Sequence, residues 1–140
     1  RRDRGDRLDA VAEAEAAGYA RHLGELEIEE LIAAFARASA LVHFPTEESF
    51  GLVVAEALAR NLKLFAASVG GVVDIASGVD GAELFSADDF NGLENSLACW
   101  MEAKCPRPGE TAALMRERYH PQVIAQRHLE IYCEVLASKK

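Results

Sequence analysis

Two glutamates flank a glycine in the segment PTEESFGLVVAEALAR, residues 45–60. Glu48 and Glu56 are separated by seven residues, and Gly51 lies between them. A carboxylate accepts two hydrogen bonds at once, which suits the vicinal hydroxyls of a ribose or a hexose. The glycine lets a ligand approach the backbone, and the free N–H groups at the start of a helix favour an anion such as a phosphate. The pattern therefore predicts a site for a phosphorylated polyol.

The surroundings of Glu56 are apolar on both sides, in the stretch LVVAEALA. A solvated helix face is hard to assign there, so we expect the Glu56 carboxylate to be paired or to bind a ligand. Two structural alternatives stay open: Gly51 is an ordinary way to begin a helix, and Glu56 is a solvated residue on an outer face. His43, in the preceding run ALVHF, is interpreted as a satisfied buried histidine that points toward the site end of its strand.

The elements that must position these residues alternate between strand and helix. Amphipathic or alanine-rich patterns predict helices at 8–17, 28–36, 51–60 and 90–101, one that ends near 119, and a final C-terminal helix. Short runs predict four strands, at 19–23, 40–44, 62–68 and 83–85, and the apolar run 40–44 is expected to be buried on both faces. The alternation predicts an α/β fold, a Rossmann-like parallel sheet with helices on both faces.

Ligands of open parallel sheets bind beyond the carboxyl ends of the strands, where loops lead into helices. The run 40–44 and the helix from residue 51 form such a junction, which puts both glutamates where a ligand binds. Two further expectations concern the rest of the chain. The segment VGGVVD, residues 69–74, is interpreted as a turn, and the apolar stripe of the helix capped by Asp88 or Asp89 is expected to be core (Phe90, Leu93, Leu97, Trp100 and Met101).

Composition narrows the classes of partner. A length of 140 residues, half of them apolar, with a net charge of −8, is typical of a soluble globular domain. The acidic balance argues against nucleic-acid binding, and no apolar run is long enough to span a membrane. Three cysteines without CxxC spacing, expected to be mostly buried, favour a reducing, cytoplasmic location. The four histidines lack the spacing of a metal site, so no metal is expected.

The frame PTEESFGLVVAEALA resembles the signature of the group 1 glycosyltransferases, which have the GT-B fold. The stretch SVGGVVDIASGVDGAELFSADD is similar to a double-glycine segment of that family, and YHPQVIAQRHLEIYCEVL to its C-terminal helix. The resemblance implies that residues 1–140 form a single C-terminal, donor-binding domain of a larger two-domain protein. The chain departs from the family at Asn61 and Lys63, where Gly and Pro are usual, and at Val73-Asp74, where Pro-Glu is frequent. Asn61 tolerates the left-handed backbone of the glycine it replaces.

The resemblance also implies a role for each site residue. Glu48, the catalytic residue, would contact hydroxyls of the donor sugar, the amides of Phe50, Gly51 and Leu52 would hold the diphosphate, and Glu56 would bind the ribose. Such enzymes transfer a hexose from a UDP-, GDP- or ADP-hexose with retention of configuration and without an obligatory metal or further cofactor. The acceptor, a sugar, lipid or small molecule, would bind an N-terminal domain upstream of Arg1, which also carries the basic pair that clamps the diphosphate. The chain alone is therefore not expected to catalyse transfer.

Two other functions stay open. The departures at Asn61, Lys63 and Asp74 are compatible with a non-catalytic nucleotide-sugar-binding or interaction domain that keeps the GT-B fold. A nucleotide-sugar epimerase shares the fold class. A dinucleotide-binding domain is disfavoured, because no GxGxxG follows a predicted strand.

Overall fold

The computed structural model describes the backbone of residues 4–138 and the side chains of residues 9–138. The chain divides into two compact units with the boundary between Ala34 and Phe35. The first unit contains α1 (Arg4–Ala16) and most of α2 (Ile28–Arg37), which confirms the two helices expected at 8–17 and 28–36. Glu30 helps to begin α2, because its carboxylate accepts the N–H of Glu27 at 3.0 Å. That all 140 residues form a single donor-binding domain stays a prediction.

The strand expected at 19–23 does not form. The N–H groups of Tyr19 and Ala20 donate to the carbonyl of Ala14, each at 3.3 Å, within the C-terminal turn of α1. His22 donates its N–H to the carboxylate of Glu15 in the same helix. Three of the five backbone donors of this run therefore bond to α1 rather than to a neighbouring strand, and the prediction is wrong.

The second unit is built on a three-stranded parallel sheet in the order β1-β2-β3. The other three predicted strands are confirmed: they are β1 (Ala40–His43), β2 (Lys63–Ala67) and β3 (Ala82–Phe85). Register pairs His43 with Ala66 and Ala67 with Phe85, so the carboxyl ends of the strands lie at one edge of the sheet. β2 is central and buried, whereas β1 is an edge strand whose Val42 is 47% exposed. The expected burial of 40–44 on both faces is therefore wrong.

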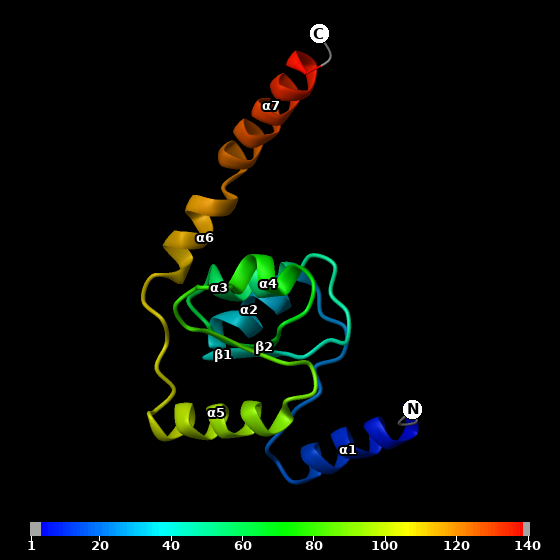
Figure 1. Cartoon of the computed structure of the whole chain (residues 1–140). Coiled ribbons are helices and arrows are strands. Elements are labelled where there is room, and N and C mark those ends of the chain that lie inside the picture. The colour runs from blue at the N-terminus through cyan, green and yellow to red at the C-terminus, as the bar shows by residue number, and fades with distance from the viewer. Residues whose placement is uncertain (1–3, 139–140) are drawn as a thin grey trace. The chain divides into compact units, whose positions relative to one another are not determined.

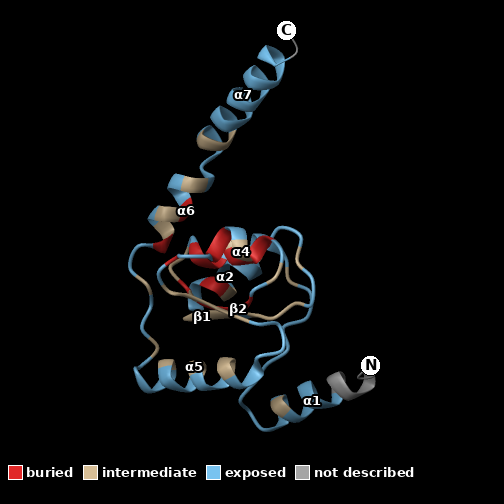
Figure 2. Ribbon diagram, viewed as in Figure 1, coloured by how far each residue is buried: buried red, intermediate tan, exposed pale blue. Residues whose placement is uncertain are grey.

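Helices cover both faces of this sheet, as the strand–helix alternation predicts. α3 (Leu52–Leu58) and α4 (Gly71–Ala76) follow β1 and β2 and pack on one face (Figures 1 and 2). Their core consists of Val54, Leu58, Leu64, Ala66, Val72, Ile75 and Ala76, joined by Val79 and Met115. α5 (Phe90–Glu102) covers the opposite face, where the Trp100 ring meets Phe65 of β2 edge-on with ring centroids 5.6 Å apart.

The last two helices are α6 (Thr111–Tyr119), which contributes Met115 to the core, and α7 (Pro121–Ala137), which has no buried residue. Both agree with the helices expected at the end of the chain. Within residues 4–138, no helix combines the length and the apolar character that crossing a membrane requires.

Three details differ from expectation. The segment VGGVVD is more than a turn, because α4 begins at Gly71. The stripe of α5 is not fully core, since Phe90 and Met101 are 63% and 64% exposed, whereas Leu93, Leu97 and Trp100 are half-buried. Cys99 and Cys133 are exposed rather than buried. The expected cap of α5 is confirmed, with Asp89 accepting the N–H of Gly92 at 2.9 Å.

Candidate functional site

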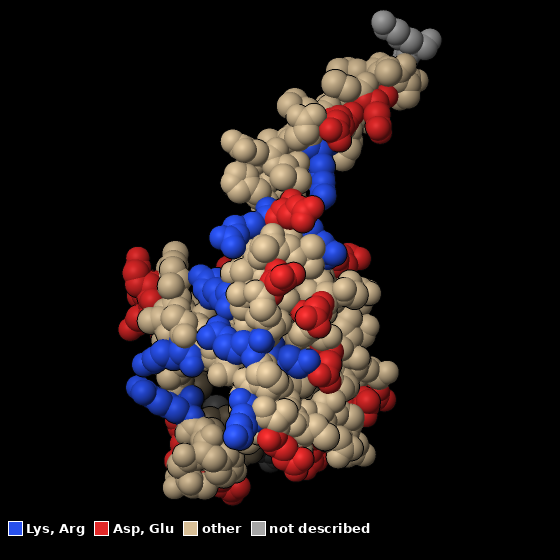
Figure 3. All heavy atoms as spheres, turned by 90° about the vertical axis from the view of Figure 1, so that its left-hand side faces the viewer, with Lys and Arg blue, Asp and Glu red and all other residues tan. Residues whose placement is uncertain are grey.

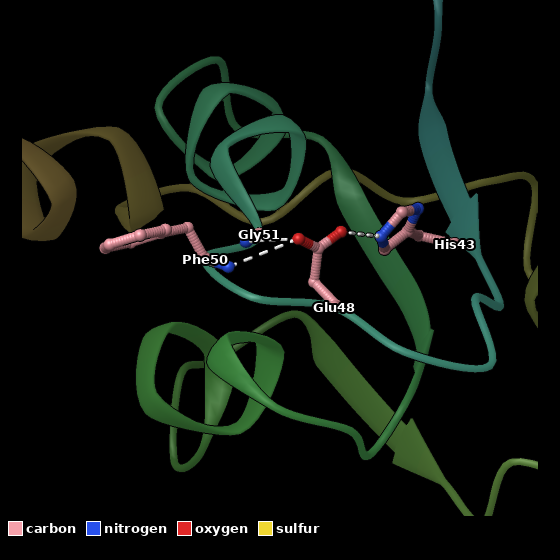
Figure 4. A network of polar contacts seen from close by, with 4 residues as sticks. All are labelled: His43, Glu48, Phe50 and Gly51. Carbon is pink, nitrogen blue, oxygen red and sulfur yellow. Dashed lines mark hydrogen bonds and ion pairs between the residues drawn. The ribbon is translucent and has the colours of Figure 1, made fainter.

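The loop between β1 and α3 is the centre of the candidate site, and Glu48 binds back onto it (Figure 4). One carboxylate oxygen, Oε1, accepts the N–H of Gly51 at 3.0 Å and that of Phe50 at 3.2 Å. The other oxygen, Oε2, lies 3.1 Å from Nε2 of His43. The carboxylate therefore ties the end of the strand to the start of the helix.

These hydrogen bonds stabilise the ionised form of Glu48. The Gly51 N–H contributes most to holding the pKa of Glu48 below its ordinary value of 4.5, and the hydrogen bond with His43 comes next. Desolvation acts in the opposite direction and is outweighed. Because the Glu48 side chain is also 24% exposed, a ligand in solution can reach a carboxylate that is already ionised.

Two of the three amides expected to hold a diphosphate are bonded to Glu48, namely those of Phe50 and Gly51. The N–H groups of Leu52 and Val53 have no hydrogen-bond partner among the described residues, as is usual in the first turn of a helix. Hydrogen bonding within the helix begins with Val54, whose N–H donates to Gly51 at 2.9 Å. The structure thus offers an anion two free amides beside an ionised carboxylate.

Gly70 and Gly71 bring the loop after β2 against the loop that holds Glu48. The N–H of Gly71 donates to the carbonyl of Glu48 at 3.2 Å. A Cβ on Gly70 would overlap that carbonyl at 1.7 Å, and a Cβ on Gly71 would lie 2.5 Å from the carbonyl oxygen of Phe50. No larger residue fits at either position while the two loops stay this close. The double glycine is therefore part of the site's framework, a role that its interpretation as a turn missed.

Glu56 lies on the exposed face of α3, together with Leu52 and Ala59. The expectation that its apolar neighbours leave no solvated face is wrong, because two of those neighbours themselves lie on that face. No hydrogen bond to its carboxylate forms within the described residues, so the carboxylate is open to a ligand. It borders an apolar groove of about 330 Å³, whose other lining residues include Leu52, Ala55, Arg60, Met115 and Tyr119.

His43 belongs to the site, although the sequence was interpreted as giving a satisfied buried histidine that only points toward the site end of its strand. Its side chain is 22% exposed, and its partner is the site carboxylate of Glu48 itself. The available signal was the position of His43 at the end of β1, five residues before Glu48. In a parallel sheet, the loop that follows the carboxyl end of a strand often binds the ligand.

Arginines lie at the far end of α3, about 10 Å from its start for a helix of this length. Arg60 donates to the carbonyl of Glu56 at 2.9 Å, and Arg107 donates to the carbonyl of Arg60 at 2.9 Å. Lys and Arg side chains gather on the face drawn in Figure 3. Positive charge is favourable at a helix C-terminus, so these two arginines stabilise the end of α3 rather than the free amides at its start. No group of three or more potential metal ligands occurs in the described part of the chain.

Two of the residues that differ from the family frame, Asn61 and Lys63, make polar contacts within the fold. Asn61 is left-handed, with φ 55°, as expected of a residue that replaces glycine, and its Oδ1 accepts the N–H of Ala112 at 2.7 Å and the hydroxyl of Thr111 at 3.0 Å. Lys63 pairs with Glu83 of β3, with Nζ 2.6 Å from Oε1. Asp74 is exposed in the first turn of α4.

Comparison with known proteins gives a family match and a fold match. Residues 2–102 match the family model described as "Glycosyl transferases group 1". No curated protein matches the chain. Among 24 matching solved chains is sucrose-phosphate synthase from Thermosynechococcus elongatus, with 21% identity and a TM-score of 0.74. The match covers 99% of this chain and 36% of the other, and it confirms the expected α/β, GT-B-type fold class.

Proposed function

The chain belongs to the group 1 glycosyltransferases, and from this membership we propose that it binds the nucleotide-diphosphate sugar from which an enzyme transfers a hexose. The observation that carries the proposal is the ionised Glu48, held beside the free amides of Leu52 and Val53 at the carboxyl end of β1. Ligands of open parallel sheets bind at this edge, and helix N-termini favour phosphate.

Each part of the donor has its own partner in this proposal. The sugar hydroxyls meet the carboxylate of Glu48, and the ribose hydroxyls meet that of Glu56. The diphosphate binds the free amide of Leu52, with that of Val53 beside it, while the amides of Phe50 and Gly51, also expected to hold it, stay bonded to Glu48 and anchor its carboxylate. Support for the ribose contact comes from the exposure of Glu56 on the same helix.

The chemistry that these groups supply is stabilisation of the departing diphosphate. Amides and the positive end of the helix dipole meet the negative charge that grows on the leaving group. We propose that transfer proceeds with retention, without an obligatory metal, and in the cytoplasm. The chain spans 36% of the length of the solved sucrose-phosphate synthase. We assign the acceptor, a sugar, lipid or small molecule, to residues outside this chain.

Calorimetric titration of the full-length protein with UDP, GDP and ADP tests the binding role. Glu56→Ala removes charged hydrogen bonds to the ribose, and the affinity for the nucleotide that binds should fall about ten- to a hundredfold. Glu47→Ala is the matched control, because Glu47 is exposed and makes no hydrogen bond among the described residues. Unchanged affinity in Glu56→Ala would remove this residue from the site.

One observation favours a second function, binding without transfer. The chain departs from the family frame at Asn61 and Lys63, which make contacts within the fold, and at Asp74, whose side chain is shorter than the usual glutamate. Product analysis with the bound nucleotide sugar and a panel of acceptors separates the two functions. Binding with no transferred product would favour a non-catalytic nucleotide-sugar-binding or interaction domain, and a sugar altered without an acceptor would indicate an epimerase.

A further inference from the structure

We propose that His43 is a positioning residue for the donor sugar: it holds Oε2 of Glu48 in the orientation in which that oxygen accepts the sugar hydroxyls. The inference rests on the proposed function and adds to it a residue that the glutamate frame does not contain. Figure 4 shows the arrangement, with the imidazole on one side of the carboxylate and the loop amides on the other.

The backbone carbonyl and Oε1 of Glu48 are held by backbone amides, so only Oε2 depends on His43 for its position. Its backbone carbonyl accepts the N–H of Gly71 at 3.2 Å, and its Oε1 accepts the amides of Phe50 and Gly51. Without His43, these contacts alone would let Oε2 rotate about the anchored Oε1. The Nε2 of His43, 3.1 Å away, is its one hydrogen-bond partner among the described residues. Removing His43 therefore loosens the oxygen that has spare acceptor capacity for a ligand.

His43 is suited to this role because it lies on a rigid element. It is the last residue of β1, and the register places it beside Ala66 of the buried strand β2. An ionised carboxylate has no proton to donate, so Nε2 must carry the hydrogen that points at Glu48. The other lone pair of Oε2 remains for a hydroxyl, and the 24% exposure of the Glu48 side chain lets that hydroxyl approach. A glutamate ordered in advance loses less conformational freedom when the sugar binds.

A purely structural role for His43 makes a different prediction. If the pair with Glu48 only stabilises the loop, loss of His43 weakens the binding of nucleoside diphosphate and of nucleotide sugar alike. If His43 positions Oε2, only the additional affinity that the sugar provides is lost. The ratio of the two dissociation constants therefore separates positioning from stability.

The test is calorimetric titration of the full-length protein and of His43→Gln, His43→Asn and His43→Leu. The probes are UDP-glucose, GDP-mannose and ADP-glucose, each paired with its nucleoside diphosphate. Gln places an N–H donor near the position of Nε2, whereas the shorter Asn does not reach it. We expect Leu and Asn to weaken nucleotide-sugar binding about five- to tenfold and nucleoside-diphosphate binding less than about twofold. Gln should restore the wild-type ratio.

Two results would overturn the positioning role. One is a His43→Leu variant in which the ratio of the two dissociation constants is unchanged, because both probes are weakened equally or not at all. The other is a His43→Gln variant that binds the nucleotide sugar as weakly as His43→Asn. Should the Leu variant not fold, the comparison of Gln with Asn still decides, because both are polar and close in size. Those outcomes leave the proposed function standing as long as the wild-type protein binds a nucleotide sugar. If the wild-type protein binds none of the six probes, the proposed function and this inference fall together.

Discussion

At the scale of single residues, the site is organised by how one carboxylate is satisfied. Oε1 of Glu48 accepts hydrogen bonds from two amides of its own loop, and Oε2 is bonded to His43, so the carboxylate is fixed before any ligand arrives. Glu56, by contrast, is exposed and its carboxylate makes no hydrogen bond within the described residues. The two glutamates of one sequence frame thus start from opposite states, one preorganised and one free.

The lowered pKa of Glu48 predicts a pH-dependent stability. The folded protein favours the carboxylate, so Glu48 stabilises the fold above its ordinary pKa of 4.5, and this contribution is lost as the pH falls through the lower, folded value. Glu48→Gln cannot ionise. The difference in unfolding free energy between wild type and this variant should therefore shrink as the pH is lowered through the ordinary value of 4.5 and below it.

Urea unfolding at a series of pH values measures this difference. Glu47→Gln is the control, because the neighbouring carboxylate is exposed and makes no hydrogen bond among the described residues. A gap between wild type and Glu48→Gln that stays constant over this range would show that the loop amides do not favour the ionised form.

At the scale of elements, two contacts join parts of the second unit that are distant in sequence, and the first is made by the side chain of Asn61. Its left-handed backbone replaces a glycine, and its Oδ1 accepts the N–H of Ala112 and the hydroxyl of the buried Thr111. The residue that precedes α6, Glu110, makes no side-chain cap. Asn61 therefore caps α6 from a distant part of the chain.

Substitutions at Asn61 separate the cap from the backbone. Asn61→Gly keeps the left-handed conformation and loses the cap, which should cost about 1 kcal/mol of unfolding free energy. Asn61→Ala adds the strain of a left-handed alanine, of the order of another 1 kcal/mol. Asn61→Asp keeps the acceptor oxygen and should lie near wild type. Equal stability of the Gly and Asp variants, measured by chemical denaturation, would show that the cap contributes nothing.

The second contact is the close approach of Gly71 to the loop that holds Glu48. Gly71→Ala puts a Cβ 2.5 Å from the carbonyl oxygen of Phe50, so the two loops must separate. We expect a loss of about 1–3 kcal/mol of unfolding free energy, together with weaker nucleotide-sugar binding. Gly109→Ala is the control, because its Cβ would meet nothing within 4 Å. Thermal unfolding and calorimetry measure both effects, and a Gly71→Ala protein that matches the control would argue against tight loop contact.

The elements predictable from the sequence are those whose own residues carry a regular apolar pattern. The apolar run 63–67 becomes the buried central strand, and the three-to-four-residue repeat of 28–36 becomes α2. The run 19–23 was also a strand candidate, but the N–H groups of Tyr19, Ala20 and His22 bond to α1, which no local pattern reveals. The exposure of Glu56 was also missed, because a helix can leave apolar residues such as Leu52 on its outer face. The role of Gly71 depends on contact between two loops and cannot be seen in either segment alone.

At the scale of the whole molecule, family membership and fold similarity cover different lengths of chain. The family model matches residues 2–102, whereas the fold match extends over 99% of the chain and so includes most of α6 and α7. α7 has no buried residue, and its Leu136 is 69% exposed. The site lies wholly within the part that the family model matches.

Retention of configuration is the prediction that belongs to the complete enzyme. Proton NMR of the first product formed from an α-linked nucleotide hexose should show an α-linked product. The spectrum of the donor alone is the reference. A β-linked product would contradict a retaining reaction while leaving the donor site intact.

The central claim is that one donor molecule spans Glu48, the start of α3 and Glu56. The most direct test titrates wild type, Glu48→Ala and Glu56→Ala with a nucleoside diphosphate and with the matching nucleotide sugar. The account predicts that Glu56→Ala weakens both ligands by a similar factor of about ten to a hundred, whereas Glu48→Ala lowers mainly the additional affinity that the sugar provides. Equal effects of both substitutions on both ligands, or no effect of either, would contradict this division between the two glutamates.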